Sequence, residues 1–413
     1  MASPPAHRAS PPVLPDELVE EILLRLPPDD PACLIRSSVV CKTWGSAVTH
    51  PSFRRRIHEL HRTPPVLGFL HDCRDEGMAN FIPTTASAFS LAAPDRRFWR
   101  ALDCRHGRAL FLSKGRNTKE LLVWEPVTGR QRRVSVPAAF GCLNAAVFCT
   151  AEACDHRDCH GGPFGVGFVF TDNTDDEEYT LLACVYSSET STWGKQTSML
   201  DDFSFDFTYY SSLLVGRSVL YFMSDDGFIV EYDLARNELT VIDAPPGSPY
   251  RFTLMLAEDG GLGLIQDLDS HLKLWSRETS ARWVLSRIIY LDNLLPVDAL
   301  VDAESSLFVT GFAEVANVIF VNTAAGLFTI ELLSERVRKV YGNNDFSLLI
   351  PVVGFYSPVS RNEHQALPRL NVSEEERGEE EKTVDQTQQL FDNRSNDIKE
   401  RTSSKCPNLS AMS

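Results

Sequence analysis

The chain has 413 residues, with 40 lysines and arginines against 56 aspartates and glutamates, so its net charge is −16. That length suggests two or three domains, and 43% hydrophobic with 23% charged residues excludes a wholly disordered chain. The acidic balance argues against a dedicated nucleic-acid binder. The sequence contains no run of about 18 apolar residues, so we expect no helix that spans a bilayer. The ten cysteines are too scattered for a disulfide framework. We expect a cytoplasmic or nuclear protein that binds neither nucleic acid nor membrane.

Composition divides the chain into four segments. Residues 1–12 are rich in proline, 13–62 have helical patterns, 63–360 are rich in short β-type segments, and 361–413 are acidic and polar. The last segment has hardly any aromatic residues, so it cannot bury enough apolar surface to offset the entropy of ordering. We therefore expect disorder in 1–12 and 361–413 and folded domains at 13–62 and 63–360. The net charge of the segment 63–360 is −14.

Segment 13–62 is predicted to contain three helices. The apolar residues of the first stretch recur at the spacing of one helix face, at Leu18, Val19, Ile22, Leu23 and Leu26. Two prolines then end the helix, and two aspartates ahead of Pro31 mark the start of a second. Apolar residues from Leu34 to Val48 continue at helical spacing, which predicts one second helix. Pro51 separates it from a third helix.

The same segment resembles the F-box. Its opening Leu14-Pro-Asp-Glu-Leu, its centre Val40-Cys-Lys-Thr-Trp44 and its close Pro51-Ser-Phe53 follow the family's motifs in order. The resemblance implies a three-helix unit that docks on a Skp-type adaptor and, through it, on a cullin–RING ubiquitin ligase. The departure is a proline-rich link at 27–31, which could shift the second helix. The resemblance implies adaptor contacts at Leu14, Pro15, Leu18, Ile22, Leu26, Val40, Cys41, Lys42, Trp44 and Phe53.

Segment 13–62 is too small to bury all of its own apolar side chains. A unit of about 45 residues is near the lower limit for a self-sufficient core. Its apolar side chains outnumber those that three short helices can hide among themselves, so some must face a partner or the rest of the chain. Packing on the downstream domain, as a plain helical cap, is the alternative to adaptor docking.

Segment 63–360 contains a degenerate repeat. Five lines share an apolar strand end, a polar turn and a second strand, with a recurring aromatic residue or isoleucine at Trp124, Tyr186, Tyr232, Trp275 and Ile330. The intervals are 62, 46, 43 and 55 residues, against about 40–50 for a four-stranded propeller blade. Stacking such blades in a closed ring buries both apolar faces of each and protects the strand edges.

These lines predict an all-β propeller of about six blades. Segments 66–70 and 346–356 would complete one blade from the two ends of the domain. The stretches at 254–264 and 346–358 are similar to the F-box-associated, kelch-like propellers of plant F-box families. The chain lacks the paired glycines of regular kelch repeats and the Trp-Asp ends of WD repeats.

One cluster has residue types that bind metals: Cys149, Cys154, His156, Cys159 and His160. Zinc sites usually present two close ligand pairs, whereas this is one loose cluster in a glycine-rich stretch without a second pair at a recognised interval. We therefore expect no metal and no cofactor, and interpret the stretch as an insertion in the blade of the second repeat with incidental thiols. The motifs of catalytic serine or zinc hydrolases are absent from the sequence.

The leading hypothesis is a non-catalytic substrate receptor of a ubiquitin ligase, whose F-box holds the adaptor and whose propeller holds a target protein. Proximity would be the mechanism, since fixing a target beside the conjugating enzyme raises the effective concentration of its lysines. The acidic middle segment favours a target with a basic patch. Two alternatives are a propeller scaffold outside any ligase and a propeller glycosidase. The latter predicts several inward carboxylates at one end of the central channel.

Overall fold

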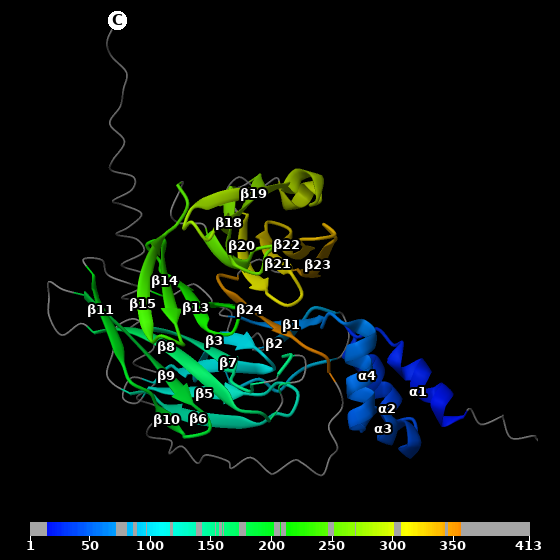
Figure 1. The fold of residues 1–413 in the computed structure, drawn as a ribbon. Coiled ribbons are helices and arrows are strands. Elements are labelled where there is room, and N and C mark those ends of the chain that lie inside the picture. Colours follow the sequence, from blue (N-terminus) through cyan, green and yellow to red (C-terminus); the bar gives the residue numbers. More distant parts are fainter. Residues whose placement is uncertain are drawn as a thin grey trace, which may run out of the picture. The chain divides into compact units, whose positions relative to one another are not determined.

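The structure is a computed structural model, and its described residues belong to one compact unit within 1–360 (Figure 1). It describes residues 15–71, 81–85, 89–95, 97–115, 119–137, 143–152, 154–156, 159, 161–172, 179–201, 207, 212–246, 252–268, 270–300, 307–342 and 346–356. The segments 1–12 and 361–413 and the residues Leu14 and His160 lie outside the described residues. Among the described residues, no helix has both the length and the apolar character needed to cross a membrane.

The N-terminal segment has four helices, not three: α1 (Asp16–Leu24), α2 (Pro31–Ser38), α3 (Lys42–Thr49) and α4 (Pro51–His61). The expected second helix is divided because the chain leaves helical geometry after α2, and Cys41 is extended at φ −157° and ψ 166°. The proline-rich link ends in an N-cap, where the Asp30 carboxylate accepts the backbone N–H of Ala32 at 3.2 Å. Gly45 lets α3 approach α2 closely, because a Cβ there would lie 2.8 Å from the Ser38 carbonyl oxygen.

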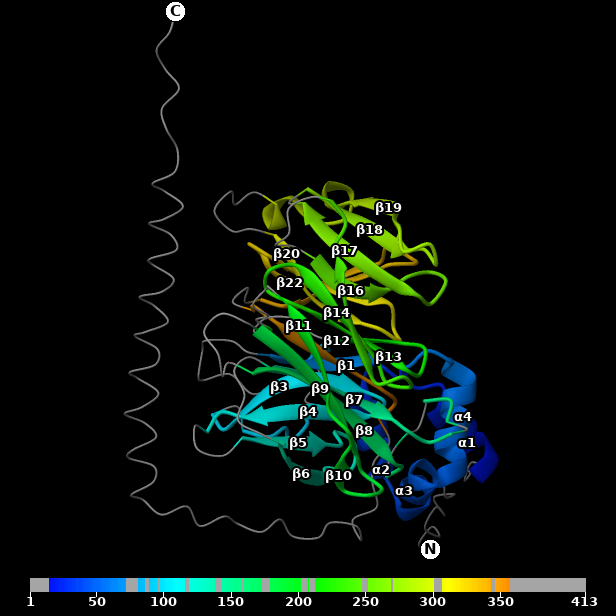
Figure 2. The same ribbon diagram turned by 60° about the vertical axis from the view of Figure 1, so that its left-hand side comes forward.

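The strands form six antiparallel sheets, and this confirms the six-bladed propeller (Figures 1 and 2). The first three blades are blade 1 with β2 (Phe81–Pro83), β1 (Val66–His71) and β24 (Leu349–Val353); blade 2 with β3 (Trp99–Arg105), β4 (Arg108–Ser113), β5 (Glu120–Trp124) and β6 (Gln131–Ser135); and blade 3 with β7 (Leu143–Cys149), β8 (Phe164–Asp172), β9 (Tyr179–Ser187), β10 (Thr192–Trp193) and β11 (Thr197–Asp201). In blade 3 both β10 and β11 pair with β9.

The other three blades have four strands each. They are blade 4 with β12 (Ser212–Val215), β13 (Val219–Met223), β14 (Phe228–Asp233) and β15 (Glu238–Asp243); blade 5 with β16 (Phe252–Leu256), β17 (Leu262–Leu268), β18 (His271–Arg277) and β19 (Trp283–Tyr290); and blade 6 with β20 (Phe308–Ala313), β21 (Val318–Thr323), β22 (Gly326–Glu331) and β23 (Val337–Tyr341). Two 3₁₀ turns, η1 (Leu291–Asn293) and η2 (Val297–Ala299), follow β19.

The two ends of the propeller close the ring, as the sequence predicted. Strand β1 pairs with β24 in antiparallel register, with Leu70 opposite Ile350 and Phe69 opposite Pro351 (Figure 1). The proline is tolerated because β24 is the edge strand of its sheet and needs no donor on its free side. The inner strands β24, β3, β7, β12, β16 and β20 contact one another in cyclic order.

Each gap between neighbouring blades is filled by its own cluster of buried apolar side chains. The cluster between blades 2 and 3 includes Val123 and Phe168, and the one between blades 6 and 1 includes Phe69 and Phe320. The other four gaps have equivalent clusters. The stability of the domain therefore comes from the faces between sheets, which only a closed ring covers on both sides.

The repeat detected in the sequence is the hairpin between the third and fourth strands. Its recurring residues lie in β5, β9, β14, β18 and β22, at Trp124, Tyr186, Tyr232, Trp275 and Ile330. The hairpins also share a left-handed residue, at Gly129, Ser191, Asn237, Ala281 and Glu335, with φ between 56° and 73°. Only glycine and asparagine suit that conformation well, so three of these turns keep residues that strain the backbone.

The helical segment shares part of its core with the propeller. Phe355, two residues after β24, lies in the cluster of the helices, and its ring centroid is 4.5 Å from that of His58 in α4. Ala32 belongs to the cluster between blades 1 and 2, and Ile35 packs against it. Arg338 of β23 pairs with Asp29 at 3.4 Å. The helical segment therefore packs against the propeller through α2 and α4.

Candidate adaptor-binding surface

Helix α1 has a buried side and an exposed apolar side. Val19, Leu23 and Leu24 are buried in the helical core. Leu18 and Ile22 lie one turn apart and remain 52% and 50% exposed. An exposed leucine and isoleucine on successive turns leave apolar area in contact with water, which is unfavourable unless a partner covers it.

A second exposed apolar group lies where α2 ends. Val39 is 75% and Val40 63% exposed, because the chain leaves the helix there and turns toward α3. Cys41 and Lys42, which follow, are also exposed. We call Leu18, Ile22, Val39 and Val40 the exposed apolar set.

Ion pairs and hydrogen bonds from α4 hold α1 in place. The Arg56 guanidinium pairs with Glu20 at 2.8 Å and also with Glu21. Its hydrogen bond to Glu20 raises the pKa of Arg56 above its ordinary value, so the group stays charged. The His61 Nε2 atom lies 2.8 Å from the carbonyl oxygen of Leu24 at the end of α1. These contacts fix the side of α1 that faces outward.

The remaining residues assigned to the adaptor from sequence lie in three different environments. Pro15 is exposed at the N-cap of α1. Leu26 and Trp44 are half-buried and pack against the helical core. Phe53 is 1% exposed inside that core, so its assignment as an adaptor contact is corrected: it supports the surface from within. The sequence analysis missed Val39, whose exposure depends on the break between α2 and α3.

Residues in or next to the inner strands of several blades form a buried ionic cluster. Arg105 of β3 pairs with Asp103 at 3.1 Å and with Glu314, just after β20, at 2.9 Å. The same guanidinium donates to the carbonyl of Ser212 in β12 at 2.9 Å. Asp103 also accepts the backbone N–H of Val147 in β7 at 2.8 Å. The cluster thus links blades 2, 3, 4 and 6 across the ring.

Burial dominates the electrostatics of this cluster. It raises the pKa of Asp103, and it raises the pKa of Glu314 to about 7 against the attraction of Arg105. Both carboxylates are engaged by a nearly inaccessible arginine. A glycosidase needs two carboxylates that reach a sugar from opposite sides, so this arrangement does not favour that alternative.

The structure brings together four of the five residues that the sequence singled out as metal-like. One ligand atom from each of Cys149, Cys154, His156 and Cys159 lies within 4.8 Å of all the others. They come from the end of β7 and from the connection to β8. The expectation that these residues form only a loose group is therefore wrong, because four of the side chains lie within reach of a single metal ion.

Comparison with protein families decides the classification. An F-box domain model matches residues 12–56. A model described as "F-box protein AT5G49610-like, beta-propeller" matches residues 100–359, more than half of the chain. The chain belongs to this family of F-box propeller proteins. The four helices are thus its F-box, and the six sheets are its propeller.

Similar solved structures exist for the F-box propeller protein, at low identity. A functionally unknown protein from Desulfotomaculum acetoxidans is 9% identical, with 71% of this chain and 84% of that chain covered and a TM-score of 0.35. A structural genomics protein of unknown function from Bacteroides thetaiotaomicron is 13% identical, with 65% of each chain covered and a TM-score of 0.34. A comparison with curated proteins gave no match. The fold assignment therefore depends on the sheets described above and on the family model.

Proposed function

We propose that this F-box protein is the substrate-recognition subunit of a Skp–cullin–F-box ubiquitin ligase. In this proposal the F-box binds a Skp-type adaptor, the adaptor carries the cullin, and the propeller binds a target protein. The protein itself performs no chemistry and raises the effective concentration of the target's lysines near the conjugating enzyme. A cytoplasmic or nuclear location is part of the proposal, and the free thiols of the described cysteines are in keeping with it.

One observation carries the proposal: the F-box packs on the propeller with one side and leaves the exposed apolar set uncovered. Ala32, Ile35 and Phe355 lie in the apolar clusters that helices and blades share. Leu18, Ile22, Val39 and Val40 belong to neither of these clusters and stay at least half exposed. The alternative that these residues serve only to cap the propeller is therefore not supported. A partner with a complementary apolar groove fits them better.

The target-binding side of the proposal rests on charge. Segment 63–360 has a net charge of −14, so its field would speed the encounter with a basic partner. We propose a target protein with a basic patch. Weaker association of the target at higher salt would support this, and salt-independent association would oppose it.

Calorimetric titration with a Skp-type adaptor tests the proposed function. Burying a leucine or isoleucine contributes about 1.5–3 kcal/mol, so L18A/I22A in the full chain should weaken adaptor binding at least tenfold, since about 1.4 kcal/mol is one decade. V297A and L333A, which change similarly exposed residues of the propeller at 75% and 76%, serve as controls and should bind normally. Absence of binding by the wild-type chain would leave the alternative, a scaffold outside any ligase.

A further inference from the structure

We propose that Cys149, Cys154, His156 and Cys159 bind a zinc ion that braces the connection between β7 and β8 of blade 3. The Sγ atoms of Cys154 and Cys159 are 3.3 Å apart, and the Sγ of Cys159 is 3.6 Å from Nδ1 of His156. Zinc–sulfur distances of about 2.3 Å and zinc–nitrogen distances of about 2.0–2.1 Å place the ligand atoms of a tetrahedron about 3.5–3.8 Å apart. The observed spacing is close to these values.

The chemistry of the ligand set points to zinc. Three thiolates and one imidazole form a Cys₃His set, which is one of the usual structural zinc sites. Such a set fills all four positions and leaves none for water or substrate. The site would therefore stabilise the fold and would not catalyse a reaction. A disulfide between Cys154 and Cys159 is the competing arrangement, but their sulfur atoms lie well beyond the bonding distance of about 2.05 Å.

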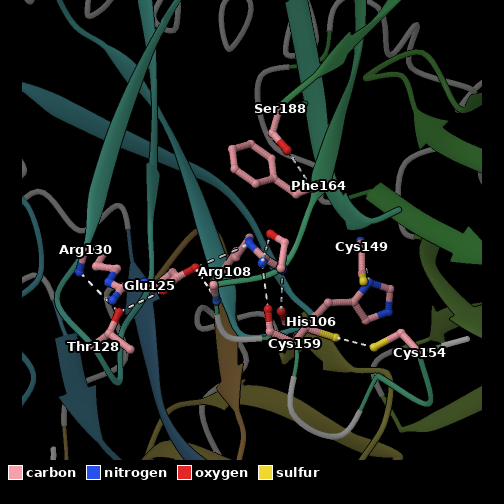
Figure 3. A network of polar contacts seen from close by, with 12 residues as sticks. His106, Arg108, Glu125, Thr128, Arg130, Cys149, Cys154, Cys159, Phe164 and Ser188 are labelled. Atoms are coloured by element: carbon pink, nitrogen blue, oxygen red, sulfur yellow. Dashed lines mark hydrogen bonds and ion pairs between the residues drawn. The ribbon is translucent and has the colours of Figure 1, made fainter. Parts of the chain in front are cut away.

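Two arginines from neighbouring blades hold the ligand-bearing chain by its backbone carbonyls. Arg108 of β4 is 1% exposed and donates to the carbonyl oxygen of Cys159 at 2.6 Å and to that of Gly162 at 2.7 Å (Figure 3). Arg217, between β12 and β13, donates to the carbonyl oxygens of Ala151 and Glu152 at 2.7 Å each. The loop is thereby fixed at both ends by groups that are not ligands.

A histidine from blade 2 supports the ligands from the side. The ring of His106 stacks on that of His156 with centroids 4.0 Å apart and an interplanar angle of 15°. Its Nδ1 accepts the backbone N–H of Cys149 at 3.1 Å (Figure 3). The backbone N–H of His156 donates to the Sγ of Cys154 at 3.4 Å, a contact that favours a thiolate.

Charge balance also favours a metal at this position. A zinc ion with three thiolates and a neutral histidine carries a net charge of −1. The positive guanidinium group of Arg217, bound to the same loop, offsets that charge at short range, whereas Arg108 is paired with Glu125 at 3.6 Å. The charge of Arg217 is therefore compatible with a zinc centre of net charge −1 on this loop.

Metal analysis of the full chain, purified under reducing conditions without chelators, tests the inference. We expect about one zinc ion per chain in the wild type and in C184S, which changes a buried cysteine of β9 outside the group. C154S/C159S should contain none. Equal zinc content in wild type and double variant, or no zinc in the wild type, would overturn the proposal.

Cobalt substitution of the wild-type chain keeps the inference testable if the double variant fails to fold. Zinc removed by a chelator and replaced by cobalt should give the visible absorption bands of a tetrahedral cobalt–thiolate centre. C184S should give the same bands. A spectrum typical of octahedral cobalt without thiolate ligands, or no uptake of cobalt, would contradict the assignment.

Discussion

The F-box and the propeller solve the problem of apolar burial in opposite ways. The propeller closes on itself, and every gap between its blades holds a buried cluster. The F-box has four helices of at most 11 residues, borrows Phe355 from the propeller for its core, and still exposes Leu18, Ile22, Val39 and Val40. A closed ring of blades can bury its apolar faces without a partner. A small helical unit that leaves apolar residues exposed needs another surface to cover them.

Opening the ring should give the largest effect. A chain that ends at Asn343 lacks β24, which supplies the buried Leu349, Ile350 and Val352 and pairs with β1. We expect insoluble protein, because bare strand edges promote aggregation. A chain that ends at Val359 keeps the strand and should stay soluble. A shorter chain that is soluble and melts cooperatively would show that the pairing of β1 with β24 is not needed for the fold.

Replacing Phe355, which packs in the core of the F-box, should destabilise the F-box without destabilising the propeller. F355A deletes a ring that is 5% exposed and should destabilise the F-box by about 3–5 kcal/mol. Hydrogen exchange should become faster in α1 and α4 and stay unchanged in the strands of blades 3 to 5. L333A is the matched surface control. Uniform loss of protection in helices and strands would show that the two regions unfold as one.

The ionic cluster of the propeller should give a pH dependence that the F-box lacks. The pKa of Glu314 is raised from 4.5 to about 7, so the folded state binds this proton more tightly than the unfolded chain. Stability contributed by the group is therefore present below pH 4.5 and is lost as the pH rises toward 7, with a slope of at most about 1.4 kcal/mol per pH unit.

The variant E314Q isolates that effect. Burial also raises the pKa of Asp103 in the same cluster, so the wild-type curve alone mixes the two groups. The free energy of unfolding of wild type minus that of E314Q should decrease between pH 5 and pH 7 in denaturant titrations. Parallel curves for the two proteins would show that Glu314 does not titrate in this range.

The smallest effects are expected in the shared hairpins of the propeller. A281G relieves an exposed residue held at φ 64° and should stabilise the protein by about 0.5–1 kcal/mol. G129A places a side chain at φ 73° in an equivalent turn and should cost about 1 kcal/mol. Thermal melting resolves these shifts. Stabilisation by both changes would contradict a common left-handed position.

Much of the fold was predictable because it depends on local patterns. The aromatic residues at 124, 186, 232 and 275 revealed the hairpins, and the apolar strands near 66 and 350 indicated the closing blade. The exposed positions Leu18 and Ile22 followed from helical spacing and from the resemblance to the F-box.

Features that depend on long-range contacts were not predictable. The chain is extended at Cys41 between α2 and α3, and Val39 before it is exposed. Phe53 of α4 is interior because it packs in the cluster of the helices, which includes Phe355 from far along the chain. The contact of Arg105 with Glu314 joins residues 209 apart in sequence. The four metal-like residues lie close together in a loop whose carbonyls accept hydrogen bonds from Arg108 and Arg217 of the neighbouring blades, and ligand spacing alone does not reveal this.

Hydrogen exchange of the full chain with and without a Skp-type adaptor tests the central claim most directly, that the F-box surface binds a partner while the propeller stays free for another. We predict that the adaptor slows exchange in α1 and in the segment from Val39 to Lys42, and leaves the strands of blades 2 to 6 unchanged. Protection confined to propeller strands, or none anywhere at saturating adaptor, would contradict the account.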